Sequence, residues 1–456
     1  MQASAAFAAK QAVHAVSTAP RGTPHRMDDM DASPTHVVIV GGGFAGLWAA
    51  RALRSAPVRI TLVDRGNHHL FQPLLYQVAT AGLSAPDIAA PLRQILRRQK
   101  NVQVQLATVS RIDVAAREVE LDHAEGVRRL RYDYLLLASG ATHAYFGNEH
   151  WAKHAPGLKT LDNALDLRRR LLLAFERAEA ATDPAERDAW LSFAIIGGGP
   201  TGVELAGTLS EIARHTLGGE FRNIDPARAR VRLVEAGPRV LSSFPEDLSE
   251  RARAQLEKLG VEVQTGAAVE DITGAGYRRA GEFVPARTVV WAAGVAASPL
   301  GRCLDVPLDR AGRVQVRPDL SIPGHPEVFV AGDLAALARA DGRPVPGVAP
   351  AAKQMGRHVA RMIRARLAGQ EGEGTPFRYR DFGNLATIGR MAAVVDLGRL
   401  RISGVLAWWF WLLAHLFFLI GFRNRSVVLL NWSVAYWTHQ RAARIILGGD
   451  DRSDTK

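Results

Sequence analysis

The chain has 456 residues, 47% of them hydrophobic and 22% charged, and this composition is that of a globular protein too long for one compact core. Its formal net charge of +12 favours an anionic partner, which is a nucleic acid, an anionic membrane surface or an anionic cofactor. The single cysteine, Cys303, excludes an intrachain disulfide and every mechanism that needs a cysteine pair, and it favours a reducing compartment.

Residues 1–34 are rich in Ala, Ser, Pro and Asp and carry no long apolar pattern. They also lack the apolar core and the cleavage signal of a secretory peptide. We therefore expect a disordered extension over residues 1–34 and assign it no function.

The segment Thr35–Ala50 predicts a strand, a glycine turn and a helix in succession. Val37–Val40 are apolar without interruption, which is the pattern of an inner strand of a parallel sheet that is buried on both faces. The turn that follows fits G-x-G-x-x-G through Gly41, Gly43 and Gly46. In this motif the first glycine makes the tight turn, the second lets the backbone approach a pyrophosphate, and the third packs the helix on the strand.

A second apolar strand, Val58–Val63, ends in Asp64, whose carboxylate is placed to accept hydrogen bonds from a ribose. A glycine pattern alone also arises by chance in flexible loops. The order of strand, glycine turn, helix, strand and acidic residue favours dinucleotide binding over that alternative. Downstream, His68 and His69 have no carboxylate or cysteine at ligand spacing, so we expect no metal site.

Two short strands are predicted next, at Val102–Leu106 and Arg117–Leu121. The stretch Tyr132–Ala141 predicts a further apolar strand that ends in a turn of small residues, Ser139 and Gly140. Such a turn permits backbone contact with a bound nucleotide.

The opening pattern returns after an amphipathic helix predicted over Lys159–Ala180. Phe193–Ala206 reads as a second strand, glycine turn and helix, with its glycines at 197, 199 and 202. A later strand, Val231–Val234, is capped by Glu235. An acidic side chain there binds both ribose hydroxyls and repels a 2′-phosphate, so NADH is preferred over NADPH.

The strand predicted at Thr288–Trp291 ends in Ala292-Ala293-Gly294, which parallels Ala138-Ser139-Gly140 after the first motif. The internal duplication therefore includes the closing strand as well as the glycine turn. Two copies of the pattern predict two nucleotide sites, one nested inside the sequence of the other.

The two glycine turns, their closing strands and Val328–Asp333 resemble the two-dinucleotide-binding-domain flavoprotein superfamily. In that superfamily the first turn holds FAD, an inserted domain holds the nicotinamide cofactor, and the late Gly-Asp contacts the FAD ribityl chain and pyrophosphate. Within it, Phe71–Thr80, Gly197–Glu204 and Val234–Leu241 most closely resemble type II NADH:quinone oxidoreductase, the single-subunit, non-pumping respiratory dehydrogenase. The resemblance runs from about Thr35 to the C-terminus.

The resemblance implies an α/β fold of two nested Rossmann-like dinucleotide-binding domains plus a C-terminal helical membrane-anchoring segment. The expected FAD-binding domain has two parts, residues 35–155 and 293–376, which enclose an NADH-binding domain at 156–292. A membrane-associating region is expected at 377–456.

The cofactors implied are non-covalent FAD and, as a substrate, NADH. The expected cofactor-binding residues are Gly41, Gly43, Phe44, Ala45, Gly46, Asp64, Arg65, Pro73, Val109, Ser139, Gly140, Gly332, Asp333, Gly197, Gly199, Thr201, Gly202, Glu235 and Gly294. For Pro73 and its apolar neighbours, a plain core helix is the alternative to packing against the isoalloxazine ring. The resemblance also implies that Glu204 is catalytic, pointing at the nicotinamide and flavin to position substrate or supply a proton.

The expected quinone site departs from the family pattern. Members usually carry Ala-Gln followed four residues later by a second Gln; Gln354 matches the second, but Pro350 occupies the first position and offers neither a side-chain donor nor an N–H. We therefore expect other contacts to hold the head group of ubiquinone or menaquinone, through Lys353 or backbone groups near Ala351, with Gln354 as a catalytic candidate. The alternative is that Gln354 caps or packs the helix that follows.

The composition changes after Arg401. Ile402–Phe422 is apolar and uncharged, and it precedes Arg423, Arg425 and the aromatic-rich stretch Val427–Trp437. About 20 apolar residues are enough for a transmembrane helix, but the density of Trp and Tyr with flanking arginine also suits a segment in the lipid interface. The resemblance implies a monotopic anchor, so we expect peripheral attachment to the cytoplasmic face of the cell inner membrane; a buried core helix is the third alternative. No nucleic-acid motif is present, and we assign part of the positive charge to attraction by anionic lipid and expect no nucleic-acid partner.

The predicted reaction is FAD-dependent oxidation of NADH with two-electron reduction of a membrane quinone to quinol, without proton pumping. A sulfide:quinone oxidoreductase is disfavoured because this chain lacks redox cysteines, and a soluble ferredoxin or rubredoxin reductase because it has no use for Ile402–Phe422. A flavoprotein that senses NADH and signals through a membrane partner is the non-enzymatic alternative. The oligomeric state is open, with a homodimer as one possibility.

Overall fold

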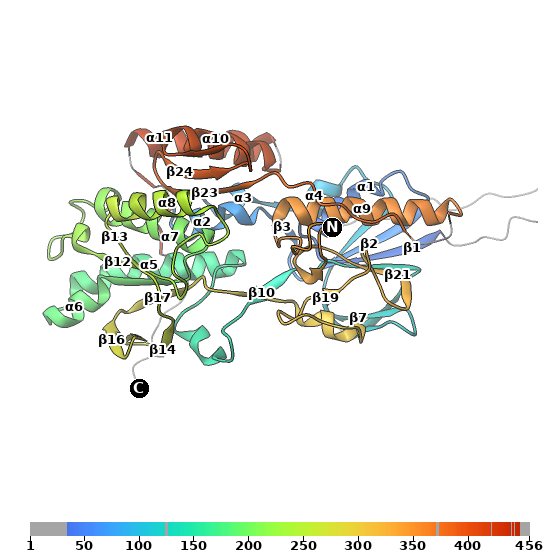
Figure 1. The fold of residues 1–456 in the computed structure, drawn as a ribbon, viewed down its shortest axis with the longest axis horizontal. Helices are drawn as coiled ribbons and strands as arrows, with labels where there is room; N and C mark the ends of the chain where they lie inside the picture. Colours follow the sequence, from blue (N-terminus) through green and yellow to red (C-terminus); the bar gives the residue numbers. More distant parts are fainter. Residues whose placement is uncertain are drawn as a thin grey trace, which may run out of the picture. The chain divides into compact units, whose positions relative to one another are not determined.

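The structure is a computed structural model that describes residues 34–123, 126–370, 374–420, 422–438, 440–441 and 443–446. Of the extension predicted over residues 1–34, all but Pro34 falls outside these ranges. The contacts of the chain divide it into Met1–Pro34 and Thr35–Lys456, and every element described below belongs to the second unit. Figure 1 labels these elements in chain order.

The first sheet has six strands in the order β20-β21-β9-β1-β2-β5. These strands are β1 (Thr35–Val40), β2 (Val58–Asp64), β5 (Val102–Leu106), β9 (Tyr134–Leu137), β20 (Ser321–Ile322) and β21 (His325–Val330). All neighbours are parallel except β20 and β21. β1 is an inner strand between β2 and β9, and its residues Val37–Val40 are all buried, as predicted for a strand covered on both faces.

Two helices far apart in sequence cover one face of this sheet. The helix α1 (Phe44–Ala52) follows the glycine turn and packs against α9 (Ala349–Leu367). A Cβ added at Gly356 would lie 2.1 Å from the carbonyl oxygen of Ala45, so the two helices approach at a position where only glycine fits. Figure 1 shows α1 and α9 together on the side of the sheet away from β7 (Glu118–His123).

The second sheet has four parallel strands in the order β13-β12-β11-β17. They are β11 (Ser192–Ile196), β12 (Arg230–Val234), β13 (Val261–Gln264) and β17 (Thr288–Trp291). Its helices are α5 (Leu161–Ala180), α6 (Pro184–Trp190), α7 (Pro200–Glu211) and α8 (Glu246–Lys258). The predicted helix at Lys159–Ala180 is confirmed as α5, which Thr160 caps through a hydrogen bond from the Asn163 N–H.

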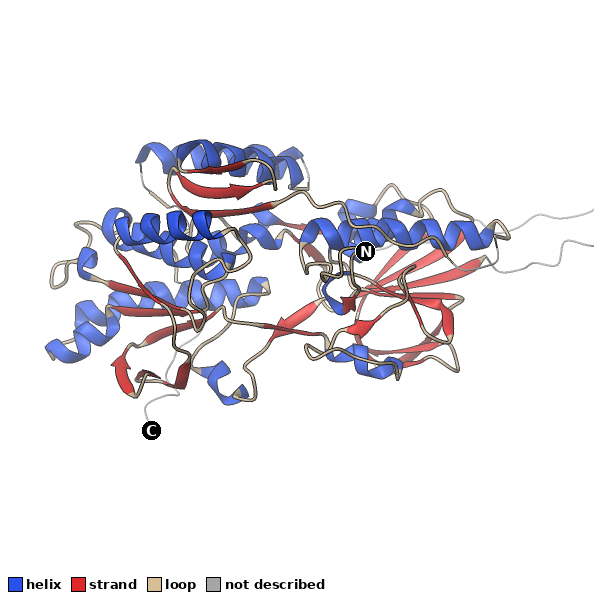
Figure 2. Ribbon diagram, in the orientation of Figure 1, coloured by secondary structure: helices blue, strands red, loops and turns tan. Residues whose placement is uncertain are grey.

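The chain passes between the two sheets through an antiparallel pair, β10 (Ala141–His143) and β18 (Val295–Ala297). Each strand follows the small-residue turn that ends a closing strand, β9 or β17. The two sheets with their helices, shown in Figure 2, confirm the α/β fold with two Rossmann-like units.

The C-terminal part forms a third sheet with two helices. Its strands are β23 (Asn384–Gly389), β24 (Ala392–Asp396) and β25 (Arg401–Ser403), and its helices are α10 (Val405–Phe418) and α11 (Phe422–Thr438). β23 lies directly on α7, because a Cβ added at Gly207 would meet the carbonyl oxygen of Ile388. The third sheet is thus packed on the helices of the second sheet.

The apolar stretch Ile402–Phe422 is divided between several elements. It begins in β25, turns at Gly404 with a φ of +75°, continues as α10 and leaves the helix at Leu419, whose backbone is extended. Within the described ranges, no helix is both long enough and apolar enough to cross a bilayer.

The remaining elements are short. The other strands are β3 (His68–Leu70), β4 (Ala89–Pro91), β6 (Thr108–Asp113), β8 (Gly126–Arg131), β14 (Val269–Thr273), β15 (Gly276–Arg279), β16 (Glu282–Pro285), β19 (Val314–Gln315) and β22 (Ala335–Ala336). The other helices and helical turns are η1 (Gln72–Leu74), α2 (Leu75–Ala79), α3 (Ala85–Ile88), α4 (Leu92–Leu96), η2 (Glu149–Lys153), η3 (Ile212–Thr216), η4 (Pro226–Arg228), η5 (Pro299–Leu304) and η6 (Gly332–Leu334). Cys303 lies in η5 and is partly buried.

Candidate functional site

The first glycine turn is held by the carboxylate at the end of β2. Asp64 Oδ2 accepts a hydrogen bond from the Gly42 N–H at 2.5 Å, and Oδ1 accepts one from the Gly66 N–H at 2.7 Å. The Gly41 N–H donates to the Val63 carbonyl oxygen at 2.8 Å. The turn therefore has a fixed position at the carboxyl ends of β1 and β2, where ligands bind in open α/β sheets.

The three motif glycines have the surroundings that a pyrophosphate site requires. A Cβ at Gly41 would lie 2.3 Å from the Ala138 carbonyl oxygen, and one at Gly46 would lie 1.9 Å from the Gly41 carbonyl oxygen. A Cβ at Gly43 would meet no atom within 4 Å. Packing thus requires Gly41 and Gly46, while Gly43 faces open space at the start of α1, and this cradle fits the pyrophosphate of a dinucleotide.

Segments from three other parts of the chain lie beside this turn. Ser139 follows β9, and its buried Oγ has no hydrogen-bond partner in the described part of the chain. Gly332 has a φ of +78° and lies against Ala45 and Ala352, which a Cβ at Gly332 would approach to 3.6 and 3.5 Å. The structure therefore brings Gly332, and with it the late Gly-Asp pair, to the first turn of α1.

The other predicted residues of the first site differ in exposure. Phe44 packs edge to face on His69 at 4.9 Å between ring centroids, Ala45 is buried, and Arg65 is exposed. Pro73 is half-buried in η1, and Val109 is buried on β6. Gly140 has a φ of +70°, and its carbonyl oxygen accepts from the Ser298 N–H.

The second glycine turn repeats the first. Glu235 Oε2 accepts from the Gly198 N–H at 2.6 Å, and Oε1 accepts from the Gly237 N–H at 2.7 Å. A Cβ at Gly197 would lie 2.5 Å from the carbonyl carbon of Ala292. A Cβ at Gly202 would lie 1.9 Å from the Gly197 carbonyl oxygen, whereas one at Gly199 would meet open space.

Two further predicted residues lie near this turn. Thr201 is exposed in the first turn of α7. Gly294 lies beside the exposed ring of Phe146, to which an added Cβ would come within 2.6 Å. The two sites therefore share one arrangement. The first and third glycines of each motif are packed against the backbone, and the middle glycine faces open space.

Glu204 lies on α7, 8% exposed, between that helix and β23. Burial raises the pKa of its carboxyl well above the ordinary value, although a hydrogen bond from the Thr387 backbone opposes the rise. Tyr76, on α2, is 3% exposed, and its pKa is raised first by burial and then by the charge of Glu204. Burial therefore favours the protonated form of Glu204, which lies close to the Phe71–Thr80 segment.

A second buried acid lies two helical turns further along α7. Burial raises the pKa of Glu211, although Arg441 opposes the rise, and the Glu211 Oε2 atom lies 3.3 Å from Arg441 Nη2. Arg441 also donates to the Thr80 carbonyl oxygen at 3.2 Å. On the same side, the Trp432 indole N–H donates to Gln77 Oε1 at 2.7 Å. Sequence reasoning missed these links, which join residues of the C-terminal segment to α2 and α7.

The predicted quinone residues divide between two sides of α9. Pro350 and the buried Ala351 lie in its first turn. Both amide atoms of Gln354 bond the backbone of Arg380 at 2.9 Å, so its side chain is turned to the segment that returns from α9. The Lys353 ammonium instead lies 4.8 Å from the ring centroid of Trp48 and 5.5 Å from that of Phe418 on α10.

Aromatic side chains and two neutral histidines fill the region between the first glycine turn and α10. The His69 Nδ1–H donates to the Gly42 carbonyl oxygen at 3.0 Å, and burial lowers the pKa of His69 to about 4. His415, on α10, lies 4.3 Å from Trp411 and 6.2 Å from Phe71 between ring centroids. Its pKa is also lowered by burial to about 4. The one sequence signal for His415 is a polar residue inside an apolar stretch.

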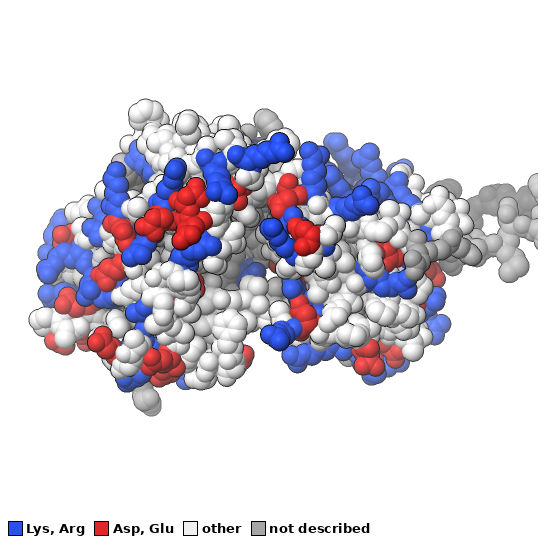
Figure 3. Space-filling model, viewed as in Figure 1, with Lys and Arg blue, Asp and Glu red and all other residues white. Residues whose placement is uncertain are grey.

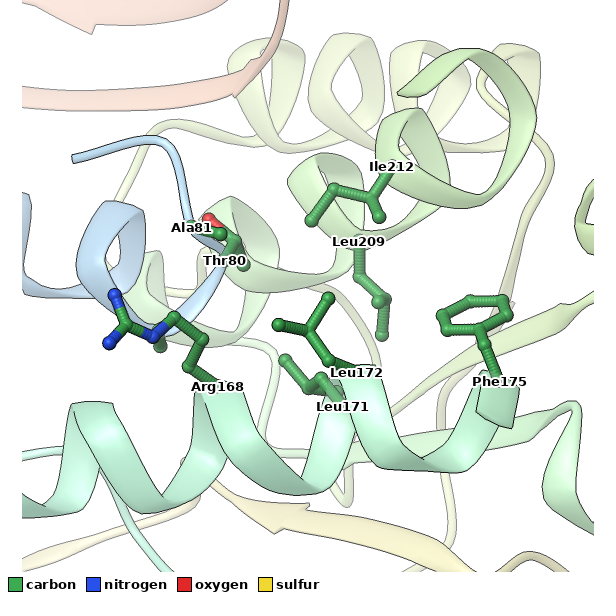
Figure 4. A pocket seen from close by; sticks show the side chains of 9 residues that line it. Thr80, Ala81, Arg168, Leu171, Leu172, Phe175, Leu209 and Ile212 are labelled. Carbon is green, nitrogen blue, oxygen red and sulfur yellow. The ribbon is translucent and has the colours of Figure 1, made fainter. Parts of the chain in front are cut away.

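A small cavity lies between α5, α7 and the turn after α2 (Figure 4). Its volume is about 10 Å³, which is about the space of one water molecule. The side chains of Leu171, Leu209 and Ile212 make it mostly apolar. It is too small for a cofactor or a substrate.

Two family models match the chain. Residues 35–356 match the pyridine nucleotide-disulphide oxidoreductase family, and residues 382–438 match the NDH2 C-terminal domain. The first model spans both glycine turns, and the second spans β23–β25 with α10 and α11. The chain nevertheless has a single cysteine, so it cannot form an intrachain disulphide.

Relatives cover nearly the whole chain. Type II NADH:quinone oxidoreductase Ndh of Mycobacterium tuberculosis is 49% identical over 89% of this chain and 89% of its own length. An internal alternative NAD(P)H-ubiquinone oxidoreductase A1, mitochondrial, of Arabidopsis thaliana is 30% identical over 92% of this chain and 89% of its own. The solved structure of NDH2 from Plasmodium falciparum in complex with NADH shares the fold, with a TM-score of 0.82, 18% identity, and coverage of 91% of this chain and 100% of that one.

The two nucleotide cradles, the C-terminal domain and the 49% identity lead to one conclusion: the chain belongs to the type II NADH:quinone oxidoreductases, a family of FAD-dependent enzymes.

Proposed function

We propose that the protein oxidises NADH and reduces a membrane quinone, with FAD on the first glycine turn and NADH on the second. The observation that carries this assignment is the repeated cradle, in which Gly43 and Gly199 face open space while the flanking glycines are fixed by packing. Bound FAD supplies the capacity to take a hydride from NADH and to pass two electrons to a quinone. The protein aligns NADH and the quinone with the FAD, supplies a proton to the quinone and excludes water from the site.

The FAD would be held by the residues around the first turn. The backbone N–H groups at the start of α1 and its helix dipole bind the pyrophosphate, with Gly43 allowing close approach. Asp64 fixes the turn and faces the ribose, and Asp333 with Gly332 contacts the ribityl chain and pyrophosphate. No covalent link is proposed, so acid precipitation should release all of the flavin.

NADH binds to the second turn in the same way. The start of α7 receives the pyrophosphate, and Glu235 receives the ribose hydroxyls while it holds the turn through two backbone N–H groups. The carboxylate repels a 2′-phosphate, so NADH is preferred over NADPH. In this proposal residues 35–155 and 293–376 form the FAD-binding domain, residues 156–292 the NADH-binding domain and residues 377–456 the membrane-associating region.

Glu204 is the proposed acid for quinone reduction. Burial raises its pKa and so favours the protonated carboxyl, and a quinone that takes two electrons also takes two protons. The quinone head group is proposed to lie near Pro350, Ala351 and Lys353, whereas the Gln354 amide bonds the Arg380 backbone and its role stays a prediction. Of these, Lys353 has the strongest support, because it lies between Trp48 and Phe418 at the junction of α1, α9 and α10.

Attachment to a lipid surface is proposed through α10 and α11. Both helices expose large apolar side chains, including Leu406 at 74%, Phe417 at 71% and Trp437 at 80%. Their inward residues, such as Trp411, are part of the core, so the helices are fixed to the enzyme and present one apolar face. We infer a monotopic attachment on the cytoplasmic face of the inner membrane; a homodimer stays a prediction.

Steady-state NADH consumption tests the function. Purified protein reconstituted with FAD should oxidise NADH rapidly only when ubiquinone or menaquinone is present, and one of the two should give the higher kcat/KM. A flavoprotein that only senses NADH would bind NADH without quinone-dependent turnover.

A further inference from the structure

A surface hollow of about 430 Å³ lies along α9, and none of the residues that line it belongs to either glycine turn. It is lined by Ala52 of α1, by one side of α9 and by the returning segment at Phe377 and Arg378. Four arginines line it, and no acidic residue lies among the described residues around it. These four are Arg357, Arg361, Arg364 and Arg378.

The arginines of α9 extend a single basic stripe. Lys353, Arg357, Arg361 and Arg364 follow one another at intervals of four, four and three residues, which places them on one side of an α-helix over about 16 Å. Neither α9 nor α1 contains an acidic residue. Figure 3 shows Lys and Arg side chains gathered over the part of the molecule where Figure 1 places α1, α4 and α9.

Hydrogen bonds and a ring contact hold the wall of the hollow in place. Gln354 holds the backbone of Arg380 through both atoms of its amide, and the Phe377 N–H donates to the Pro318 carbonyl oxygen at 2.7 Å. The ring of Phe377 packs on that of His358 at 5.4 Å between centroids. The segment that carries Arg378 is thus fixed opposite α9.

Two of the four guanidinium groups have no hydrogen-bond or ion-pair partner in the described part of the chain. Arg364 donates to Ser55 Oγ, and Arg361 donates to His358 Nδ1. The side chains of Arg357 and Arg378 are exposed and make no hydrogen bond or ion pair with any described residue. Guanidinium groups without acidic partners match the oxygens of a phosphate, which accepts two parallel hydrogen bonds from each.

The position of the hollow indicates where that phosphate comes from. The stripe begins at Lys353, whose ammonium lies 5.5 Å from the ring centroid of Phe418 at the end of α10. Phe417, beside it, is 71% exposed, and Leu413 is 60% exposed. A molecule with a phosphate head and an apolar tail would therefore meet the arginines and the apolar face of α10 together.

We propose that the arginine hollow on α9 binds the phosphate head group of an anionic phospholipid. The proposal rests on the membrane attachment proposed above and adds a defined head-group site to it. Such a site orients the enzyme on the lipid surface, because it adds a second contact beside the apolar face of α10 and α11. It also makes attachment depend on lipid charge as well as on apolar burial.

Vesicle binding of the FAD-loaded protein tests the proposal with matched variants. The test pair is R357Q/R378Q, which removes no side-chain hydrogen bond or ion pair between described residues. The control pair is R302Q/R310Q, which removes the same charge from exposed residues in and after η5. Binding is measured at physiological ionic strength to vesicles of phosphatidylcholine alone and with about one fifth phosphatidylglycerol. Near a membrane each basic residue changes binding by about fivefold, so R357Q/R378Q should lose about 25-fold of the preference for phosphatidylglycerol and the control little.

Three results would overturn the head-group site. An equal loss in both pairs would mean that only net charge matters, and an unchanged preference in R357Q/R378Q would mean that the hollow is not used. Calorimetric binding of inorganic phosphate that R357Q/R378Q abolishes, without a change in vesicle binding, would identify a soluble phosphate site instead.

A separate variant tests the proposed attachment through α10 independently of the arginine hollow. L413Q/F417Q should lose binding to both kinds of vesicle. If it binds like the parent protein, the proposed attachment through α10 is wrong. The proposed arginine site is tested separately, by R357Q/R378Q.

Discussion

Arg441 and Glu211 form a largely buried ion pair although 230 residues separate them in the chain, with Nη2 and Oε2 3.3 Å apart. Their side chains are 13% and 16% exposed. Arg441 also bonds Thr80 behind α2, so the segment after α11 is fixed to elements of both nucleotide-binding halves. The pair therefore links the segment after α11 directly to α7.

Removal of Arg441 should destabilise the protein. R441M leaves the Glu211 carboxyl without its ion-pair partner, although the Arg390 N–H still donates to it. We expect a loss of about 2 kcal/mol in the free energy of unfolding, below the range for fully buried pairs, because both groups retain some exposure. The double variant E211Q/R441M should recover part of this loss, because an amide costs less to bury than a carboxylate. Urea unfolding followed by flavin fluorescence measures both. Equal stabilities of R441M and the parent would show that the pair contributes nothing.

The middle glycines of the two motifs, Gly43 and Gly199, give a steric prediction for alanine substitution. The backbone at Gly43 and Gly199 has negative φ and allows alanine, and the added methyl group meets no atom of the protein. Gly43→Ala should therefore fold but bind FAD at least about tenfold more weakly, because the methyl group stands where the pyrophosphate approaches. Gly199→Ala should keep its FAD and raise the KM for NADH.

The control for this prediction is Gly46→Ala. Its Cβ would lie 1.9 Å from the Gly41 carbonyl oxygen, so we expect little folded protein whether or not FAD is added. If Gly43→Ala kept the parent's FAD affinity, measured by flavin fluorescence quenching, the first turn would not be the pyrophosphate site.

Glu204→Gln tests the proposed acid. The variant keeps the shape and the burial of the side chain but cannot release a proton, so we expect kcat with quinone to fall about a hundredfold while bound FAD stays unchanged. Reduction of the flavin by NADH in a stopped-flow experiment should change much less. Full turnover at saturating NADH and quinone would remove Glu204 from the catalytic residues.

The same residue predicts the pH dependence of stability. The pKa of Glu204 is raised in the folded protein above its ordinary value of 4.5, so the folded state keeps a proton that the unfolded state releases. Stability is therefore greatest below that value and falls as the pH rises above it, by about 1.4 kcal/mol per pH unit for one such group, until the buried carboxyl ionises. Glu211 contributes in the same direction.

Glu204→Gln should reduce the decrease in the free energy of unfolding between pH 5 and pH 7. Denaturation midpoints between pH 5 and pH 7 compare the slopes of the variant and the parent protein. Parallel curves would mean that Glu204 does not hold a proton in this range.

Membrane attachment should depend on exposed side chains of the terminal helices. Deletion of residues 400–456 is the simplest test that the sequence offers, but it would remove Trp411 and Val428 from the core. The substitutions L430Q and W437S instead change residues that are 64% and 80% exposed, and they should weaken sedimentation with membranes while NADH oxidation by a water-soluble quinone persists. Unchanged sedimentation after salt washing would place the attachment elsewhere.

The local parts of the site could be predicted from the sequence. Gly41, Gly43 and Gly46 follow a buried strand at fixed spacing, and Asp64 ends the next strand, so strand order and turn geometry follow from neighbouring residues. The paired closing strands are local patterns too. The proposed roles of these residues stay predictions until ligands are tested.

The long-range parts could not be predicted in this way. Nothing near Gln77 or Lys353 in the sequence indicates that Trp432 bonds the first or that Phe418 packs on the second, because these contacts depend on how the third sheet packs on α7. The apolar stretch Ile402–Phe422 likewise has the length of one long helix. Gly404 and the extended backbone at Leu419 limit α10 to Val405–Phe418.

The most direct test of the central claim is an anaerobic titration of the purified, FAD-loaded protein. NADH should bleach the flavin absorbance with a stoichiometry of one per chain, and a soluble quinone added afterwards should restore it completely within the turnover time. Protein that stays colourless after reconstitution with FAD, or bleached protein that no quinone reoxidises, would contradict the account.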